Sequence, residues 1–309
     1  MILIILGDKY KLNKIELNQI QKKYSPNHIS LENKSTEQII KELSKLCKNQ
    51  KYKLIILNTK ANIPDELIKY LTSLELKGIK FLTIEHFLEK YLGKVYIPRD
   101  GSNIDFLDQI KSYKQKQLLI KRIIDFSISI PLGIISMPIM LYAAYRIKKE
   151  SPEGPVIFKQ KRIGLNGKEF VCYKFRSMVP DAEKGKPKFA SKDDPRVFKW
   201  GAFMRKTRID ELPQLWNVIK GDMHLIGPRP ERKYWIDIFE KNIPYYNLRH
   251  IVKPGITGWA QVCYPYGANE EDAYQKLLYD LYYIKNWSFW LEMKTIFKTI
   301  LVMFGKKGI

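Results

Sequence analysis

The feature that most restricts the fold of this chain is an apolar stretch from Ile123 to Tyr142. It is about the length that crosses a hydrocarbon core of roughly 30 Å as a straight helix. Basic residues flank it on both sides: Lys121, Arg122, Arg146, Lys148 and Lys149. Because cytoplasmic flanks of membrane segments are enriched in lysine and arginine, both ends are expected on one face of the membrane.

Pro138 provides a way for this helix to turn back. A proline inside a helix removes a backbone hydrogen bond and clashes with the carbonyl four residues earlier, which predicts a kink within residues 134–138. Ser136 can cap a backbone group that the kink frees. We therefore expect a re-entrant helix, with an ordinary spanning helix and a buried soluble helix as alternatives. Asp125 needs a partner in lipid, and Arg122 is the nearest candidate in the sequence.

Residues 1–99 alternate short apolar runs with lysine-rich amphipathic segments. The runs predict strands over Ile2–Leu6, Leu54–Leu57 and Ile79–Ile84. The segments between them predict helices over Lys14–Lys22, Thr36–Cys47 and Pro64–Leu76. This order predicts a small parallel sheet in an α/β module. Gly7 has no GxGxxG motif behind it, so a structural or regulatory module is favoured over a dinucleotide site.

The rest of the chain divides into three predicted parts. Residues 100–120 are polar and indicate a linker with a short helix, and residues 121–149 form the apolar segment. Residues 150–309 are mixed and basic, which predicts a mainly helical α/β domain. Aromatic residues gather near its end: Tyr282, Tyr283, Trp287, Phe289 and Trp290. They fit an amphipathic interfacial helix, and part of them fits the core equally well.

The formal net charge of +22 points to an anionic partner. Nucleic acid, an acidic membrane surface and a phosphorylated substrate all qualify. The three cysteines, Cys47, Cys172 and Cys263, show no CxxC spacing, so a disulfide framework or a thiolate zinc site is disfavoured. A reducing cytoplasm is the expected compartment.

Two adjacent carboxylates, Asp210 and Glu211, lie in the strongly basic stretch "RKTRIDELPQLWNVIKGDMHLIGPRPE". Pro213 suits the first turn of a helix running to about Lys220, which places both acids at its N-terminus. Acids at such a position often do no more than complement the helix dipole. The positive end of the helix dipole also keeps a carboxylate at the N-terminus ionised, as a nucleophile must be.

The cations around this pair favour a functional role. Four arginines flank it: Arg205, Arg208, Arg229 and Arg232. The segments "YKFRSM" (173–178) and "KPGITGWAQ" (253–261) add further cations and glycine-containing turns. Basic side chains and exposed backbone amides are what a diphosphate needs. The residues thus predict an anionic, phosphorylated substrate handled at a membrane surface.

From about Lys121 to Ile309 the chain resembles the monotopic phosphoglycosyl transferases, bacterial sugar transferases that start membrane-linked glycan assembly. The resemblance rests on ordered motifs: "KRIIDF", "FKQKRIG", "YKFRSM", "DPR", "RKTRIDELPQLWNVIKGDM", "GPRP", "RHIVKPGITGWAQV" and "DLYYIKNWS". It implies that Asp210 attacks the β-phosphorus of a UDP-sugar and expels UMP, forming an aspartyl phosphosugar. Polyprenyl phosphate, usually undecaprenyl phosphate, then takes the phosphosugar.

The resemblance also implies roles for the residues around the nucleophile. Glu211, together with Asp210, is expected to bind Mg²⁺, which neutralises charge at the transferring phosphoryl group. Substrate contacts are expected from a wider set: Arg205, Arg229, Lys174, Arg176, Lys253 and Gln261. Family members carry a re-entrant helix, commonly broken at Ser-Pro, where this chain has Met137-Pro138 with Ser136 displaced by one.

Other departures concern the loops and the N-terminal part. Lys253 stands where arginine is frequent, and Cys263-Tyr264 replaces the usual Asn-Gly. Longer relatives place four membrane helices and a Rossmann-like module before the catalytic part. This chain is expected to keep the module without those helices, as a monotopic protein on the cytoplasmic face of the bacterial inner membrane, in contact with anionic lipids and as a possible homodimer.

Three other functions compete with this prediction. A polybasic peripheral membrane scaffold would not need Asp210 and Glu211. A nucleic-acid binder would use the same charge but would not need the apolar stretch, so nucleic acid is not the expected partner. A transferase that moves a sugar rather than a phosphosugar would release UDP instead of UMP.

Overall fold

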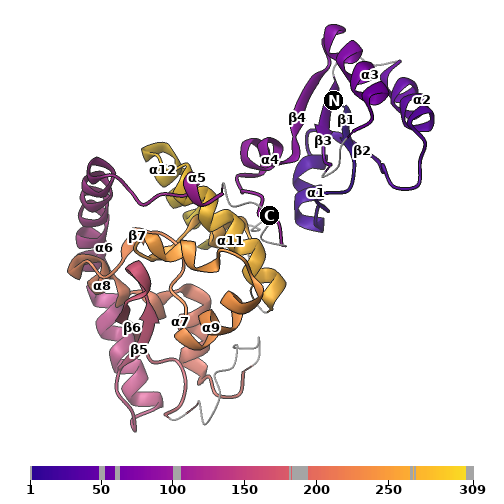
Figure 1. Ribbon diagram of the computed structural model, residues 1–309. Helices are drawn as coiled ribbons and strands as arrows, with labels where there is room; N and C mark the ends of the chain where they lie inside the picture. Colours follow the sequence, from indigo (N-terminus) through magenta and orange to yellow (C-terminus); the bar gives the residue numbers. More distant parts are fainter. Residues whose placement is uncertain are drawn as a thin grey trace. The chain divides into compact units, whose positions relative to one another are not determined.

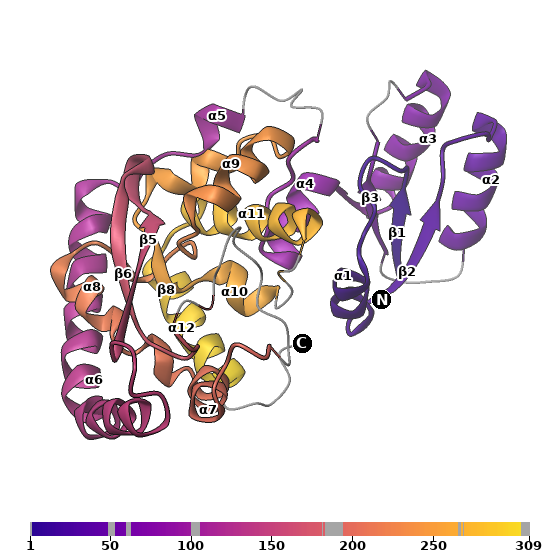
Figure 2. The ribbon, with the colours of Figure 1, turned by 90° about the horizontal axis from the view of Figure 1, so that it is seen from below.

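The computed structural model describes residues 2–48, 53–59, 63–99, 106–180, 182, 194–264, 267 and 269–303. The chain divides into two compact units, Met1–Tyr96 and Ile97–Ile309. Figures 1 and 2 show the elements of each unit.

The first unit is built on a parallel sheet of four strands in the order β2-β1-β3-β4. Its elements are β1 (Ile2–Leu6), α1 (Lys14–Gln21), β2 (Ser25–Ile29), α2 (Thr36–Cys47), β3 (Lys53–Leu57), α3 (Asp65–Leu76), β4 (Lys80–Thr83), α4 (Ile84–Phe87) and the π-helical turn η1 (Leu88–Leu92). The three predicted strands and three predicted helices are confirmed, with ends that differ by at most one residue. The parallel sheet is confirmed with them.

Two apolar layers cover the two faces of this sheet. Leu3 and Ile5 of β1 pack with α1, α4 and η1, whereas Ile4 and Leu6 pack with α2 and α3. Side chains alternate between the faces of a strand, so β1 is apolar at every position because helices cover both faces. Figure 2 shows α2 and α3 on the same side of the sheet.

Gly7 follows β1 and has a structural reason for its identity. Its φ is +101°, and a Cβ there would lie 2.5 Å from the carbonyl oxygen of Asn58. Asn58 donates hydrogen bonds from Nδ2 to the carbonyl oxygens of Gly7 and Tyr10 at 2.8 and 2.9 Å. The glycine therefore permits the close approach of two loops at the carboxyl ends of the strands.

The second unit is mainly helical, with an antiparallel pair, β5 and β6, and a short parallel pair, β7 and β8. Its elements are α5 (Phe106–Gln109), α6 (Gln115–Glu150), β5 (Ile157–Ile163), η2 (Leu165–Gly167), β6 (Glu169–Phe175), α7 (Lys199–Thr207), η3 (Ile209–Glu211), α8 (Gln214–Lys220), β7 (His224–Ile226), α9 (Lys233–Asn242), η4 (Tyr246–Ile251), β8 (Gly255–Thr257), α10 (Trp259–Cys263), α11 (Glu270–Lys285) and α12 (Phe289–Met303). The mixed α/β class predicted for this part is confirmed.

Helix α6 carries the apolar stretch and begins at Gln115, inside the segment that the sequence assigns to a linker. Within the described ranges it is the one helix with the length and composition to cross a membrane. Pro131 and Pro138 both lie inside it, and no helix boundary falls at either. The Ser136 hydroxyl donates to the carbonyl oxygen of Gly133 at 3.3 Å, next to the carbonyl that Pro138 leaves without a donor. The re-entrant path stays a prediction.

One face of α6 packs on the second unit and the remainder is exposed. The buried face includes Ser129, Ser136, Ala143 and Ile147. Exposed apolar side chains cover the rest of the helix: Ile123, Phe126, Ile130, Leu132, Ile134, Ile135, Met137, Ile139, Leu141, Tyr142 and Tyr145. Helix α12 exposes a second apolar set: Phe289, Trp290, Phe297, Ile300, Leu301, Val302 and Met303. Exposed apolar area on this scale marks a surface that another apolar phase covers, and membrane association fits it.

Asp125 has closer partners than the predicted Arg122. Its Oδ2 lies 2.6 Å from Nδ1 of His224, and its Oδ1 accepts a hydrogen bond from the backbone N–H of Leu225 at 2.7 Å. The predicted pair with Arg122 is present as a longer ion pair, with 4.0 Å between Nη1 and Oδ2, and Arg122 also donates to the carbonyl oxygens of Val218 and Ile219 at the end of α8. The carboxylate thus joins α6 to β7, while the guanidinium donates to carbonyl groups in the last turn of α8, where helix carbonyls have few intrahelical donors.

A buried ion pair joins the start of α6 to α12. Lys121 donates to Oε1 of Glu292 at 2.7 Å, to the hydroxyl of Tyr283 at 2.8 Å and to the carbonyl oxygen of Ile226 at 3.0 Å. Trp287 also donates to Glu292, at 3.0 Å. All three donors of the ammonium group are used, so the charge is buried with partners rather than alone.

Candidate active site

The two adjacent carboxylates lie on the 3₁₀ turn η3, between α7 and α8. Arg208, which ends α7, has a left-handed backbone with φ 62°, and this bend turns the chain into η3. Pro213 is the residue that precedes α8, so the predicted helix start is close to the observed one. The acids lie before that helix rather than on its first turn. Both are buried, with exposures of 9% for Asp210 and 8% for Glu211.

Glu211 is surrounded by cations. Its Oε1 lies 3.0 Å from Nη2 of Arg229 and 3.2 Å from Nζ of Lys174. Its Oε2 lies 3.8 Å from Nη1 of Arg208. Burial raises the pKa of Glu211, but the charges of Arg229, Lys174 and Arg208 outweigh burial and hold that pKa well below its usual range. Glu211 is therefore a fixed negative charge.

Asp210 differs from its neighbour. Its Oδ1 is buried and has no hydrogen-bond partner among the described residues. Burial, and then the negative charge of Glu211, raise the pKa of Asp210 to about 6, and the opposing charges of Lys174, Arg208 and Arg205 are outweighed. This pKa is raised because the residue is buried on a turn and lies beside a second acid, but with a pKa of about 6 the carboxylate is still mostly ionised at neutral pH.

Three of the predicted substrate residues lie at or near the pair. Lys174, on β6, and Arg229, in the loop after β7, contact Glu211 directly. Arg205, on α7, is half-buried, and its charge lowers the pKa of Asp210. Cationic side chains from three separate parts of the chain therefore meet at the two acids.

Arg176 has a different environment. It donates to the carbonyl oxygens of Ser151, Pro155 and Met178 and to the hydroxyl of Ser151, at 2.5 to 3.3 Å. Its side chain thus fixes the end of α6, and the described contacts include neither acid of the pair.

Lys253 also lies apart from the pair. The groups that shift its pKa, after burial, are Arg122, Asp125 and Asp222. These side chains belong to α6 and to the turn after α8. The structure therefore places Lys253 near the start of the apolar stretch rather than beside Asp210.

Gln261, on α10, lines a small cavity together with Arg229. Its Oε1 is buried without a hydrogen-bond partner among the described residues. Arg249 lines the same cavity and forms a buried ion pair with Asp280 at 2.8 Å. Sequence reasoning singled out neither Arg249 nor Arg162, although both occur inside the motifs "RHIVKPGITGWAQV" and "FKQKRIG".

The two acids fit a magnesium ion by the chemistry of their oxygens. Mg²⁺ in proteins is commonly bound by one or two carboxylates together with water and substrate phosphates. Asp210 offers a buried carboxylate oxygen without a partner, and Glu211 stays ionised beside it. Within the described ranges no group of three or more His, Cys, Asp or Glu side chains could hold a metal.

The sequence is similar to a family of known proteins. The family described as "Bacterial sugar transferase" matches residues 116–306. The UDP-N-acetylgalactosamine-undecaprenyl-phosphate N-acetylgalactosaminephosphotransferase of Aeromonas hydrophila is 42% identical over 241 residues, covering 77% of this chain and 56% of the relative. The UDP-glucose:undecaprenyl-phosphate glucose-1-phosphate transferase of Escherichia coli is 40% identical over 192 residues, covering 62% of this chain and 41% of the relative.

A third relative is named for another sugar. The undecaprenyl-phosphate galactose phosphotransferase of Salmonella typhimurium is 37% identical over 210 residues, covering 63% of this chain and 42% of the relative. The chain thus spans little more than half the length of the first of these relatives and less than half of the other two. The match over residues 116–306 covers more than half of the chain and both acids, so the chain belongs to the bacterial sugar transferase family.

Proposed function

We propose that this protein transfers a sugar-1-phosphate from a UDP-sugar to undecaprenyl phosphate, with Asp210 as the nucleophile. The observation that carries the proposal is the contrast within the pair. Asp210 has a buried carboxylate oxygen without a partner, whereas three cations hold Glu211 in place. A nucleophile needs a free electron pair, and a charge that positions substrate needs fixed partners.

In the first step an Asp210 carboxylate oxygen bonds to the β-phosphorus of the donor. The bond between that phosphorus and the bridging oxygen breaks, and UMP leaves with the electron pair. In the second step an oxygen of undecaprenyl phosphate attacks the same phosphorus, and the bond to Asp210 breaks. The products are UMP, the lipid diphosphate sugar and the original carboxylate.

The cations around Glu211 would bind and orient the diphosphate. Arg229 and Lys174 lie close enough to Glu211 to be held in place, while each keeps donors for an anionic ligand. Magnesium, when bound by Asp210 and Glu211, would supply further positive charge to the diphosphate. Arg205 would add to the same field from α7.

The lipid acceptor places the reaction at a membrane. The exposed apolar sides of α6 and α12 support attachment to a bilayer. We propose a monotopic arrangement on the cytoplasmic face of the bacterial inner membrane, with α6 re-entrant. Cysteines placed at Lys116 and Lys149, in a chain without its native cysteines, would then both react with an impermeant maleimide added to the cytoplasmic side. Reaction of the two from opposite sides would establish a spanning helix.

The reaction is tested by incubating detergent-purified protein with Mg²⁺, undecaprenyl phosphate and a panel of UDP-sugars. We expect UMP release with at least one sugar, and none from Asp210→Asn. Three relatives are named for three different sugars, so the panel includes N-acetylgalactosamine, glucose and galactose. Release of UDP would overturn the phosphosugar mechanism, and full activity of Asp210→Asn would overturn the nucleophile.

A further inference from the structure

Arg229 lies in a loop with few backbone N–H groups of its own. This segment, residues 227–231 with the sequence GPRPE, follows β7, and we refer to it as the Arg229 loop. Pro228 and Pro230 flank the arginine, and neither has an N–H group to donate. A residue before a proline also favours extended backbone, which applies to Arg229. The position of this loop therefore depends on donors from other segments.

Backbone contacts hold the two ends of the Arg229 loop. The N–H group of Gly255 donates to the carbonyl oxygen of Pro228 at 2.9 Å. The N–H group of Ile163 donates to the carbonyl oxygen of Glu231 at 3.0 Å. A Cβ on Gly255 would lie 2.1 Å from the backbone nitrogen of Gly227, so glycine permits this close approach. The ends of the loop are thus fixed to β8 and to β5.

Two arginine side chains hold the carbonyl groups in the middle of the loop. Nη2 of Arg249 donates to the carbonyl oxygen of Arg229 at 2.9 Å. Nη1 of Arg162 donates to the carbonyl oxygen of Pro230 at 3.2 Å. Hydrogen bonds from charged donors are stronger than those between neutral groups. The middle of the loop is therefore held by side chains, and its ends are held by backbone.

Arg249 is anchored to α11 as well as to the loop. Its Nη2 also donates to Oδ2 of Asp280 at 2.8 Å, and its Nη1 donates to the hydroxyl of Tyr246 at 2.9 Å. Arg249 is 6% exposed and Asp280, on α11, is 2% exposed, so this ion pair is buried with both partners present. One planar guanidinium thus joins the carbonyl oxygen of Arg229 to a helix, in directions that an ammonium group does not fix.

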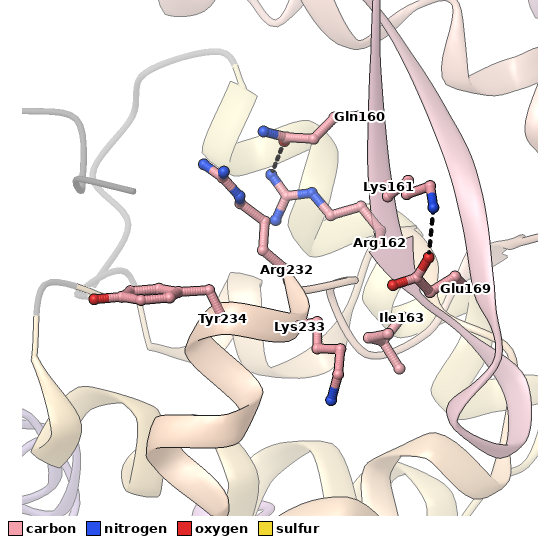
Figure 3. A pocket seen from close by; sticks show the side chains of 8 residues that line it. All are labelled: Gln160, Lys161, Arg162, Ile163, Glu169, Arg232, Lys233 and Tyr234. Carbon is pink, nitrogen blue, oxygen red and sulfur yellow. Dashed lines mark hydrogen bonds and ion pairs between the residues drawn. The ribbon is translucent and has the colours of Figure 1, made fainter. Parts of the chain in front are cut away.

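Arg162 supports the neighbouring carbonyl group from β5. Its Nη2 donates to Oε1 of Gln160 at 2.6 Å, and Figure 3 shows this contact, with both side chains extending from β5. Its Nη1 also lies 3.5 Å from Oε2 of Glu231, the last residue of the loop. These partners belong to β5 or to the Arg229 loop, so Arg162 fixes the loop to this strand.

The fixed loop directs the side chain of Arg229 to the two acids. Its Nη2 lies 3.0 Å from Oε1 of Glu211, and 31% of the arginine side chain is exposed. The side chain can therefore hold Glu211 and still meet a ligand. In the proposed function that ligand is the donor diphosphate. A misplacement of about 1 Å in such a group costs roughly a hundredfold in rate, so the position of the loop matters for the reaction.

We propose that Arg249, paired with Asp280, is a positioning residue that fixes the backbone of Arg229 so that its guanidinium meets the donor diphosphate. Arg162 supports the same loop at the next carbonyl group. The inference rests on the proposed function, which assigns the diphosphate to Arg229. Arg249 acts through the carbonyl oxygen of Arg229 and not through the substrate.

A double-mutant cycle with Arg229 tests this role. The probe is UDP with Mg²⁺, which carries the diphosphate common to the donors, and its Kd is measured by calorimetry on the full-length protein in detergent. Arg229→Ala is expected to weaken UDP binding by about tenfold or more. Arg249→Met is expected to weaken it by about fivefold or more alone, and by less than about twofold when Arg229→Ala is already present. Equal losses in the two backgrounds would overturn the inference.

A second variant separates positioning from folding. Arg249→Met leaves Asp280 buried without its cation, which destabilises the fold by itself. Arg249→Met combined with Asp280→Asn leaves no unpaired charge, so its melting temperature is expected to return toward that of wild type. Its UDP affinity is expected to stay about fivefold or more below wild type, because the donor to the Arg229 carbonyl group is still missing. Recovery of UDP affinity together with stability would show a purely structural role and overturn the inference.

The buried ion pair between Lys94 and Glu16 provides the matched control. Both side chains are fully buried, and both belong to the first unit. Lys94→Met combined with Glu16→Gln removes a buried ion pair in the same way, and is expected to bind UDP within about twofold of wild type. A loss as large as that of Arg249→Met would show that affinity follows stability alone, and would also overturn the inference.

The failure of this inference differs from a failure of the proposed function. If wild type binds no UDP, or if Arg229→Ala binds it as tightly as wild type does, Arg229 does not hold the diphosphate and the inference fails. UMP release that is lost in Asp210→Asn would still support the proposed reaction in that case. If wild type releases no UMP from any UDP-sugar, the proposed function itself fails.

Discussion

Arg229 and Lys174 donate to the same carboxylate oxygen of Glu211, at 3.0 and 3.2 Å. The two cations come from the loop after β7 and from β6, so Glu211 joins separate parts of the second unit. Asp210, the next residue, has a buried oxygen with no partner among the described residues. The cations around Glu211 thus stabilise its charged form, whereas burial without a partner destabilises the charged form of Asp210.

This difference predicts opposite effects on stability. Glu211→Gln removes the charge shared by Arg229 and Lys174, and we expect a loss of on the order of 3 kcal/mol in the free energy of unfolding. Asp210→Asn removes a buried charge that lacks a partner, and we expect a gain of about 1–3 kcal/mol. Chemical denaturation in detergent with EDTA measures both. A loss of stability in Asp210→Asn would contradict the described environment.

The buried pair between Lys121 and Glu292 predicts strong coupling. Lys121→Met leaves Glu292 buried without its cation, which is expected to cost about 3–5 kcal/mol. The double variant with Glu292→Met leaves no buried charge and is expected to recover most of that loss. Lys161→Met, at an exposed lysine, serves as the control and should change stability by about 0.5 kcal/mol or less. Additive losses in the double variant would show that the pair is not coupled.

The lowered pKa of the buried His250 predicts that stability depends on pH. Burial, and then the charge of Arg249, lower the pKa of His250 to about 4, from about 6.5 in an unfolded chain. Between these values the unfolded state binds the additional proton, so stability falls as the pH falls from about 6.5 to about 4. The full shift corresponds to about 3 kcal/mol.

Denaturation at pH 7.5 and pH 5 tests this contribution. Wild type is expected to lose more stability on acidification than His250→Gln, because the variant has no group to protonate at that position. His224 is also buried with a lowered pKa, and it is present in both proteins, so the comparison isolates His250. An equal loss in the two proteins would refute the prediction.

The exposed side of α6 predicts weaker membrane binding when it carries a charge. Ile135 is 73% exposed, so Ile135→Lys leaves the packing of the second unit intact. A lysine in the hydrocarbon region costs about 2.5–3.5 kcal/mol, which corresponds to roughly a hundredfold loss in partitioning. Leu76→Lys, at an exposed leucine of α3 in the first unit, is the control. Co-flotation with liposomes measures both, and equal binding of the two variants would argue against α6 as the attachment site.

The sequence predicted the elements whose pattern is local. Strands β1, β3 and β4 are apolar runs between turn residues, and their helices have amphipathic spacing. Strand β2, with the sequence SPNHI, was missed because it is polar and contains Pro26. It lies at the edge of the sheet, where a proline without an N–H group is tolerated.

The part of the candidate site that is local in the sequence was also predicted. Asp210 and Glu211 are adjacent, so their motif marked them directly. The roles of contacts between distant residues were not predictable: Arg176 has the same charge as Lys174 but holds the end of α6. Similarly, the closest side-chain partner of Asp125 is His224, 99 residues away, whereas spacing on one helix pointed only to the longer pair with Arg122.

The most direct test of the account is whether Asp210 becomes covalently bonded to the phosphosugar. Wild-type protein is incubated with Mg²⁺ and its UDP-sugar without lipid acceptor, quenched, digested and examined by mass spectrometry. The account predicts that the peptide containing Asp210 gains the mass of one sugar phosphate, that the adduct disappears when undecaprenyl phosphate is added, and that Asp210→Asn forms none. UMP release that requires the lipid acceptor and leaves Asp210 unmodified would contradict it.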